Sequence, residues 1–209
     1  MEVDEDGAFK IKIILIGDAG VGKTSLINVS TGKEFNEEYN RTINGYYRLK
    51  KIVIDNKRYN LYLWDTIGQE EMKSLTRIFF KNSKIVILVF DITEKCSFEG
   101  CEYWLKEVKE NLPDETIMGI CGNKSDLFQE EKVTKEEFKE YAEKLNIQKA
   151  YTSAKDDPIS FDNFLIKLVR EYINADEKEN KRKKTKTENK KILLNEDKGK
   201  KNKEKKHCC

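Results

Sequence analysis

Apolar and polar positions follow two different periodicities along the first 173 residues of the chain. Short, nearly continuous apolar runs rich in β-branched residues predict strands, and segments with apolar positions three or four residues apart predict helices. The predicted strands are Phe9–Ile16, Tyr46–Ile54, Arg58–Trp64, Ile85–Phe90, Thr116–Cys121 and Ala150–Thr152. The predicted helices are Lys23–Ser30, a short helix within Asp65–Asn82, Phe98–Asn111, Lys135–Leu145 and Ile159–Ile173. Strands that alternate with helices predict an α/β fold with a six-stranded, mostly parallel sheet flanked by about five helices.

Local signals in the sequence support several of these boundaries. Asp55-Asn56-Lys57 separates two strand-like runs and predicts a hairpin turn. Thr134, followed three residues later by Glu137, predicts a capping box at the start of a helix. Ligands bind at the carboxyl ends of the strands in sheets of this kind. We therefore expect the chemistry in the loops that follow the first, third, fifth and sixth strands.

The loop after the first predicted strand carries a glycine-rich phosphate-binding motif. Its residues fit the pattern G-x-x-x-x-G-K-[ST] and are Gly17, Asp18, Ala19, Gly20, Val21, Gly22, Lys23, Thr24 and Ser25. Glycines allow a tight, partly left-handed backbone in which successive N–H groups form an anion nest. Lys23 brings a cation to the β- and γ-phosphates, and the Thr24 hydroxyl can ligate Mg²⁺. The motif predicts a bound nucleoside triphosphate and leaves its base open.

The loops after the third, fifth and sixth predicted strands carry further polar motifs. Asp65-Thr66-Ile67-Gly68-Gln69-Glu70 offers an acid for Mg²⁺, a backbone N–H at Gly68 for the γ-phosphate, and Gln69 to orient an attacking water. Asn123-Lys124-Ser125-Asp126 offers a carboxylate that can accept hydrogen bonds from N1–H and the exocyclic amine of guanine. Adenine would leave this acid unpaired and is therefore rejected. The backbone of Ser153-Ala154-Lys155 can contact the guanine carbonyl.

Charge divides the chain into a mildly acidic domain and a basic tail. Residues 174–209 contain 14 Lys and Arg and 7 Asp and Glu, a net charge of +7, and the totals of 40 and 38 leave 26 and 31, a net charge of −5, for residues 1–173. The tail is poor in apolar residues and is predicted to be disordered. The expected organisation is a short flexible N-terminus at residues 1–7, one domain at residues 8–173, and a disordered basic tail at residues 174–209 that ends in two cysteines.

Cysteine usage and hydropathy favour a location in the cytosol. The five cysteines are few, odd in number and not spaced for a zinc site, so they are interpreted as free thiols in a reducing compartment. No apolar run reaches the about 18 residues of a membrane span. The acidic N-terminus lacks the apolar core of a secretory signal.

Taken in chain order, the four motifs resemble those of the small Ras-like GTPases: G-D-A-G-V-G-K-T, W-D-T-I-G-Q-E, N-K-S-D and S-A-K. The resemblance covers about residues 8–173 and implies the Ras-like fold of the P-loop NTPases. Within that superfamily the chain resembles the Rab branch most, through Trp64 before Asp65, the run Leu88-Val89-Phe90-Asp91-Ile92-Thr93, and the terminal Cys208-Cys209. The resemblance implies a GDP/GTP switch that hydrolyses GTP slowly and regulates vesicle and membrane trafficking.

The family also implies a role for each matching residue. Lys23 and the backbone of residues 19–24 bind phosphates, and Thr24, Thr42 and Asp65 hold Mg²⁺. Phe35 packs against the guanine, Tyr39 covers the phosphates, and Gly68 and Gln69 serve the γ-phosphate and the attacking water. The base-binding residues implied by the family are Asn123, Lys124, Asp126, Ser153, Ala154 and Lys155.

The two loops that would contact the γ-phosphate depart from the Rab pattern. Rab proteins usually have T-I-G-[VA]-[DE]-F where this chain has Thr42-Ile43-Asn44-Gly45-Tyr46-Tyr47, so the surface that effectors read has changed. Ile67 stands where the family has alanine, and β-branching makes its side chain stiff. We hypothesise that Ile67 slows hydrolysis or alters closure of the switch. Two alternatives remain open, a hydrolysis-impaired GTP-binding scaffold and a signalling GTPase of the Ras or Rho type.

The tail implies lipid anchoring. Cys208-Cys209 resembles the Rab geranylgeranylation site, and two prenyl chains with a basic tail would suffice for stable membrane attachment. The family implies an exchange factor, a GTPase-activating protein, Rab escort protein and GDI, and effectors as partners. The tail lacks the interleaved aromatic residues of nucleic-acid binders, so no nucleic acid is expected. The protein is expected to be cytoplasmic and to cycle to the cytosolic face of an intracellular membrane.

Overall fold

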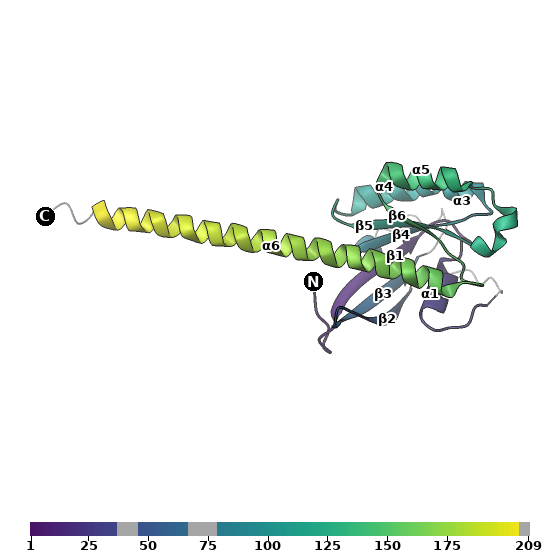
Figure 1. Ribbon diagram of the computed structural model, residues 1–209, viewed down its shortest axis with the longest axis horizontal. Helices are drawn as coiled ribbons and strands as arrows, with labels where there is room; N and C mark the ends of the chain where they lie inside the picture. The colour runs from purple at the N-terminus through teal and green to yellow at the C-terminus, as the bar shows by residue number, and fades with distance from the viewer. Residues whose placement is uncertain (37–45, 67–78, 205–209) are drawn as a thin grey trace. The chain divides into compact units, whose positions relative to one another are not determined.

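The computed structural model describes residues 1–36, 46–66 and 79–204, and describes side chains as far as residue 182 (Figure 1). The chain divides into two units, Met1–Arg170 and Glu171–Cys209. The first unit contains the whole sheet, and every residue of the candidate site that the structure describes belongs to it. Within the described residues, no helix combines the length and the apolar character that a membrane crossing requires.

A six-stranded sheet in the order β2-β3-β1-β4-β5-β6 forms the centre of the first unit. β2 is antiparallel to β3, and all other neighbours are parallel, as the alternating pattern predicted. The strands are β1 Phe9–Ile16, β2 Tyr46–Ile54, β3 Lys57–Asp65, β4 Ile85–Asp91, β5 Ile117–Asn123 and β6 Gln148–Tyr151. β3, β4 and β5 extend one or two residues further than predicted at their carboxyl ends, so Asp65, Asp91 and Asn123 each end a strand.

The helices follow the predicted pattern with two differences. They are α1 Lys23–Ser30, α3 Lys95–Glu99, α4 Cys101–Asn111, α5 Lys135–Leu145 and α6 Pro158–Glu204, with a 3₁₀ helix, η2, at Ser125–Glu130. The single helix predicted at Phe98–Asn111 is two helices that meet at Gly100, and η2 was not predicted. The short helix predicted within Asp65–Asn82 falls mostly outside the described residues. The capping box of α5 is confirmed, because the Glu137 backbone N–H donates to the Thr134 hydroxyl and the Thr134 backbone N–H donates to the Glu137 carboxylate.

Apolar side chains bury both faces of the sheet. On one face, Val86, Leu88 and Phe90 of β4 lie in a cluster with Trp104 of α4 and Phe138 of α5. Figure 1 shows α4 and α5 together on one side of the sheet. On the other face lie α1 and the first turns of α6. An added Cβ at Gly119 of β5 would come within 3 Å of Phe164 and Leu168 of α6, which shows how closely that helix packs on the sheet.

The hairpin between β2 and β3 is built as predicted. Asp55 and Asn56 both have positive φ, 49° and 60°, and Ile54 is paired with Lys57 across the turn. Two positive φ angles in succession give the tight turn whose twist matches that of the flanking strands. Asn and Asp tolerate this conformation better than other non-glycine residues. The antiparallel pair therefore follows from two local residues.

The N-terminal residues 1–7 contact β1 and β3. Val3 bridges Phe9, and the Asp4 carboxylate accepts a hydrogen bond from Asn60 at 2.7 Å and pairs with Lys10 at 2.8 Å. Gly7, with φ +75°, lets the chain turn back onto β1. The acidic composition that argued against a signal peptide thus supplies side chains that tie residues 1–7 to the sheet.

The second unit comprises Glu171–Cys209. The backbone of α6 continues through residues 171–204, where the composition predicted disorder. Low apolar content shows only that a segment cannot build a core of its own. Lys and Glu, which are frequent in this segment, are both good helix formers.

Candidate functional site

The described polar motifs lie at the carboxyl end of the sheet. β1, β3, β4 and β5 are neighbours in the sheet, and Asp65 and Asn123 are the last residues of β3 and β5. Gly17 follows β1 directly, and Thr152 and Ser153 follow β6. The parallel order therefore brings together loops as far apart in the sequence as Gly17 and Ser153, as the strand-end rule predicted.

The glycine-rich loop lies tightly against the sheet. Gly22 has φ +97°, and an added Cβ would lie 2.2 Å from Nδ2 of Asn123. At Gly17 an added Cβ would lie 2.1 Å from the carbonyl oxygen of Val89. A side chain at either position would push the loop away from the strand ends. Ala19 and Gly20 are exposed at the tip of the loop, whereas Val21 is buried.

The loop leads into a helix whose N-terminus has no side-chain cap. α1 begins at Lys23, its N-cap residue Gly22 is left-handed, and no acidic residue lies in its first turn. The first N–H groups of a helix have no partner within the helix, and its N-terminus carries partial positive charge. An anion seated at this end would satisfy both. Thr24 and Ser25, the next two residues, lie in this first turn and are half-buried.

Lys23 is a buried cation held by backbone carbonyls. Its ammonium donates hydrogen bonds to the carbonyl oxygens of Gly17 at 2.8 Å and Asp18 at 2.7 Å, and the residue is 5 % exposed. Burial lowers its pKa to about 8, although the negative charges of Asp65 and Asp18 act in the opposite direction. A buried cation whose charge is disfavoured in this way fits an anionic phosphate beside it.

Thr24 and Asp65 join the phosphate loop to the end of β3. The Thr24 hydroxyl donates a hydrogen bond to Oδ2 of Asp65 at 2.6 Å, and Asp65 is fully buried. The next residue, Thr66, donates to the carbonyl oxygen of Leu15 at 2.6 Å and fixes the chain beyond the strand. A hydroxyl and a carboxylate are hard oxygen donors that suit Mg²⁺.

The donor set matches the way in which Mg²⁺ is bound. Among the described residues, no group of three or more His, Cys, Asp or Glu side chains could hold a metal ion. Mg²⁺ is usually held by one or two protein ligands together with substrate phosphates and water rather than by a protein cage. Thr24 and Asp65 therefore fit this ion, and a phosphate at Lys23 would complete its surroundings.

Asn123 ties the base side of the site to the phosphate loop. Its Nδ2 donates to the carbonyl oxygen of Val21 at 2.9 Å, and its Oδ1 accepts from the Thr152 hydroxyl at 3.3 Å. The backbone N–H of Ser125 donates to the carbonyl oxygen of Thr152 at 3.0 Å. One buried amide thus connects the loops that follow β1, β5 and β6.

Asp126 and the segment after β6 are directly connected. The Ser153 hydroxyl donates to Oδ1 of Asp126 at 2.6 Å and accepts from the backbone N–H of Asp156 at 2.9 Å. Ala154 is buried and Lys155 is exposed. The predicted base-reading carboxylate is therefore held by the other predicted base-binding loop.

Comparison with known proteins agrees with this geometry. A model of the Ras family matches residues 12–174. The chain belongs to the Ras family. Rab-21 of Homo sapiens is 39% identical over 148 residues, which are 71% of this chain and 66% of that relative. Rab-13 of Rattus norvegicus is 36% identical over 162 residues, 78% of this chain and 79% of the relative. GTP-binding protein ypt3 of Schizosaccharomyces pombe is 35% identical over 153 residues, 73% and 72%. These relatives make the chain a Rab-type member of the small GTPases, and it spans about two thirds of the length of Rab-21.

Lys124 has a partner in this Rab-type site that the sequence reasoning missed. Its ammonium lies 2.5 Å from Oδ2 of Asp91, the last residue of β4. Asp91 is buried and also accepts hydrogen bonds from the backbone N–H and the hydroxyl of Thr93, at 2.9 and 2.8 Å. The sequence indicates only that an acid ending an apolar strand buried on both faces needs a partner, and it does not identify that partner as Lys124.

Several predicted residues are not tested by the described part of the chain. Phe35 is half-buried and precedes residues 37–45, which the structure does not describe. The remaining predictions lie outside the described residues and concern Tyr39, Thr42, Ile67, Gly68, Gln69, Cys208 and Cys209. The described half of the site therefore comprises the phosphate loop, Asp65 and the base-reading loops.

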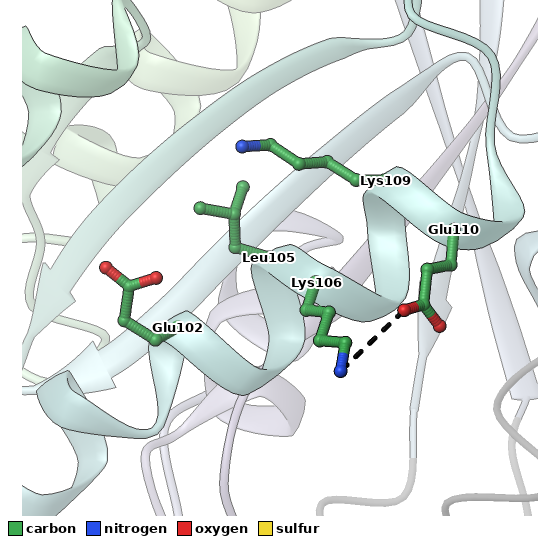
Figure 2. Close-up of a pocket in the computed structure, with 5 residues that line it drawn as sticks. All are labelled: Glu102, Leu105, Lys106, Lys109 and Glu110. Atoms are coloured by element: carbon green, nitrogen blue, oxygen red, sulfur yellow. Dashed lines mark ion pairs between the residues drawn. The ribbon is translucent and has the colours of Figure 1, made fainter.

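A separate depression of about 330 Å³ lies on the outer surface of α4 (Figure 2). Its lining residues are Glu102, Leu105, Lys106, Lys109 and Glu110. Lys106 and Glu110 form an ion pair at 3.9 Å, with side chains 74% and 49% exposed. One helix supplies every lining residue and no strand-end residue takes part, so this depression is not part of the candidate site.

Proposed function

We propose that this Rab-type protein binds GTP and GDP together with Mg²⁺, hydrolyses GTP slowly, and acts as a nucleotide-dependent switch in membrane trafficking. The observation that carries the proposal is the joining of two subsites at one sheet edge. A buried lysine and an uncapped helix N-terminus lie on one side, and a carboxylate held for base recognition lies on the other. A nucleotide is the ligand whose chemistry spans the two.

In the proposed mechanism, the phosphate loop positions the nucleotide and stabilises charge that develops during hydrolysis. Lys23 and the backbone N–H groups of residues 19–24 would neutralise the β- and γ-phosphate oxygens. Thr24 and Asp65, together with Thr42, would hold Mg²⁺, which supplies charge neutralisation at those oxygens. Gln69 would orient the attacking water, and the Gly68 N–H would contact the γ-phosphate.

On the base side, Asp126 would accept hydrogen bonds from N1–H and the exocyclic amine of guanine. Ser153 holds Oδ1 of Asp126, and Ala154 and Lys155 would contact the guanine carbonyl through their backbone. Lys124 and Phe35 would pack against the base, and Tyr39 would cover the phosphates. Adenine offers this carboxylate neither of the two donors that guanine supplies, and loss of a hydrogen-bond partner costs about 1–3 kcal/mol for a buried group, and more for a charged one.

Competition between nucleotides tests the binding part of this proposal. Fluorescent GDP bound to the full chain would be displaced by unlabelled GDP, IDP or ADP in Mg²⁺ buffer. IDP lacks the exocyclic amine, so we expect GDP to compete best, IDP less well, and ADP hardly at all. Equal competition by ADP and GDP would contradict the proposed role of Asp126.

Single-turnover hydrolysis tests the enzymatic part. We expect slow release of phosphate from bound GTP by the wild-type protein and loss of this activity in Gln69→Leu. A GTPase-activating protein would add charge stabilisation, worth about 10³–10⁵ in rate in Ras. If the wild type is as inactive as Gln69→Leu and Ile67→Ala restores hydrolysis, the alternative of a GTP-binding scaffold is favoured, with Ile67 as its cause.

We propose further that Cys208 and Cys209 are prenylated and that the tail, with its net charge of +7 over residues 174–209, adds attraction to anionic membranes. Escort protein, GDI, an exchange factor and effectors would be the partners of such a cycle. Intact mass after incubation with prenyl donor, transferase and escort protein is expected to show two added lipids. The Cys208→Ser/Cys209→Ser variant is expected to gain none and to remain unbound to vesicles.

A further inference from the structure

The phosphate loop has a second anchor, on a helix that carries no recognised motif. The indole Nε1–H of Trp104 in α4 donates a hydrogen bond to Oδ1 of Asp18 at 2.9 Å. Trp104 is 1 % exposed, so its N–H has no access to solvent. A buried indole N–H finds a hydrogen-bond partner, and a carboxylate is a stronger acceptor than a neutral group. Asp18 is therefore bound to α4 across 86 residues of sequence.

Close packing at the start of α4 holds the same carboxylate from the other side. An added Cβ at Gly100 would lie 2.5 Å from Oδ2 and 3.1 Å from Cγ of Asp18. Gly100 has φ −59° and ψ −22°, which any residue adopts, so backbone strain does not require glycine there. The absence of a side chain at Gly100 leaves the space that the Asp18 carboxylate occupies.

Asp18 also holds the phosphate-binding lysine. Its carbonyl oxygen accepts a hydrogen bond from Nζ of Lys23 at 2.7 Å. The carboxylate of Asp18 thus faces α4, while its backbone faces Lys23. Displacement of the carboxylate would move the peptide that helps to hold the Lys23 ammonium. This chain of contacts links the start of α4 to the phosphate loop within the first unit.

We propose that Trp104 and Gly100 are positioning residues for the phosphate loop, and that they act by fixing Asp18 and, through its carbonyl group, Lys23. This inference rests on the proposed function, because it assumes that Lys23 binds the nucleotide phosphates. Trp104 itself contacts no ligand in this scheme. In this scheme α4 supports nucleotide binding indirectly, because its contacts with Asp18 set how fast the nucleotide dissociates.

The test measures dissociation of fluorescent GDP from the full chain in Mg²⁺ buffer. Trp104→Phe keeps an aromatic ring but loses the N–H, and Gly100→Ala displaces the carboxylate without removing a core side chain. We expect each to accelerate dissociation about 5- to 30-fold, the ratio that corresponds to 1–2 kcal/mol. Asp18→Ala should match them, and the double variant Trp104→Phe/Asp18→Ala should be no faster than Asp18→Ala alone.

Two controls separate positioning from general destabilisation. Val108→Ala removes buried apolar groups from α4 and touches no hydrogen bond, since Val108 is 3 % exposed in the same core cluster. At a comparable loss in Tm it should leave dissociation within twofold of wild type. Asp18→Asn keeps an oxygen acceptor for the indole N–H, so its GDP dissociation rate should be close to that of the wild type.

A spectroscopic readout reports the contact directly. The chain has two tryptophans, Trp64 and Trp104, so its ¹H–¹⁵N spectrum holds two indole N–H signals, which Trp104→Phe assigns. We expect the Trp104 signal to be protected from hydrogen exchange in wild type and Asp18→Asn, and to lose protection in Asp18→Ala.

The outcomes are distinguishable. If wild type binds GDP but Trp104→Phe and Gly100→Ala dissociate at the wild-type rate, or Val108→Ala accelerates dissociation equally, the positioning role is wrong and the proposed function stands. If the wild-type protein binds no guanine nucleotide, the proposed function fails and this inference fails with it.

Discussion

The two sides of the candidate site differ in how their polar groups are satisfied. On the base side, Asn123, Asp126 and Lys124 are each hydrogen-bonded or paired with protein groups at 2.5–3.3 Å. On the phosphate side, a buried cation and an uncapped helix N-terminus concentrate positive charge, and burial lowers the pKa of Lys23 to about 8. The base side is paired within the protein, whereas on the phosphate side Lys23 donates to two backbone carbonyls while burial disfavours its charge, so we expect an anion to add stabilisation there.

This difference distinguishes interactions that stabilise the folded protein from interactions that contribute to nucleotide binding. A group that is satisfied within the protein contributes to stability in every state. Burial of a charged group lowers the free energy of unfolding unless a group of opposite charge lies beside it. We therefore expect substitutions on the base side to change the free energy of unfolding, and substitutions on the phosphate side to change nucleotide affinity.

Lys23→Met should have the largest effect, and this effect should be on nucleotide affinity rather than on the stability of the nucleotide-free protein. Methionine keeps an unbranched apolar chain but removes the cation. We expect GDP affinity to fall about 30-fold to several thousand-fold, because truncation of one partner of a buried charge pair costs about 2–5 kcal/mol. The free energy of unfolding without nucleotide should be unchanged or higher, as measured by urea titration in EDTA. A large loss of stability without nucleotide would contradict the proposed contrast.

Asn123→Ala should show the opposite behaviour on the base side. It removes the donor to the carbonyl oxygen of Val21 and the acceptor for the Thr152 hydroxyl, both in buried surroundings. We expect the nucleotide-free protein to lose about 1–3 kcal/mol of unfolding free energy, the cost of a buried polar group without a partner. Urea titrations with and without GDP test this, and equal stability of variant and wild type without nucleotide would contradict it.

Asp91→Asn should have a smaller effect, and it tests how much the ion pair between Asp91 and Lys124 contributes to the base side. The amide keeps an acceptor for Thr93 but weakens the attraction to Lys124, whose side chain is 36% exposed. Because ion pairs with access to solvent contribute about 0.2–1 kcal/mol, GDP dissociation should accelerate about 1.4- to 5-fold. Thr93→Val is the matched control, since it removes a hydroxyl bond to the same carboxylate and leaves the Lys124 pair in place. Equal acceleration in both variants would mean that Asp91 acts through the turn rather than through Lys124.

The sequence predicts the strands, the mostly parallel sheet and the placement of the described motifs at strand ends because these depend on local patterns. β1, β2, α1 and α5 begin and end where their apolar periodicity, glycines and caps predict. Asp91 and Trp104 were missed for a different reason. Each appears in the sequence as an ordinary acid or an ordinary core aromatic, and only the fold brings Asp91 to Lys124 and Trp104 to Asp18. Long-range polar pairs leave no spacing signal.

The same distinction explains the two terminal segments. Composition records that residues 1–7 and 174–209 lack an apolar core, and it contains nothing about partners elsewhere in the chain. Asp4 meets Lys10 and Asn60 only after β1 and β3 are paired. Helix propensity is a separate property from core formation, so the backbone of a lysine-rich segment can be helical even where its composition is poor in apolar residues.

Thr134→Ala should give the smallest effect on the site and test whether stability alone changes nucleotide binding. Thr134 and Glu137 cap α5, with the Glu137 N–H donating to the Thr134 hydroxyl at 3.2 Å and the Thr134 N–H donating to the Glu137 carboxylate at 3.1 Å. Loss of this cap should lower the unfolding free energy by about 1 kcal/mol. GDP dissociation should not change, because no atom of the cap touches the site. A faster dissociation would show that general stability, rather than the described contacts, controls nucleotide release.

The pH dependence of the same variant checks that the cap is the cause. Lys95 and the Thr134 N–H hold the pKa of Glu137 below its ordinary value of 4.5. A carboxylate with a lowered pKa in the folded state contributes stability that is present above its ordinary pKa and is lost as pH falls through the folded value. Lys95 and the backbone N–H of residue 134, the two largest causes of this lowered pKa, remain in Thr134→Ala, so the difference in unfolding free energy between wild type and variant should stay nearly constant from pH 7 into acid. A difference that shrinks in acid would show instead that loss of the Thr134 hydroxyl also weakens the contacts that hold the Glu137 carboxylate.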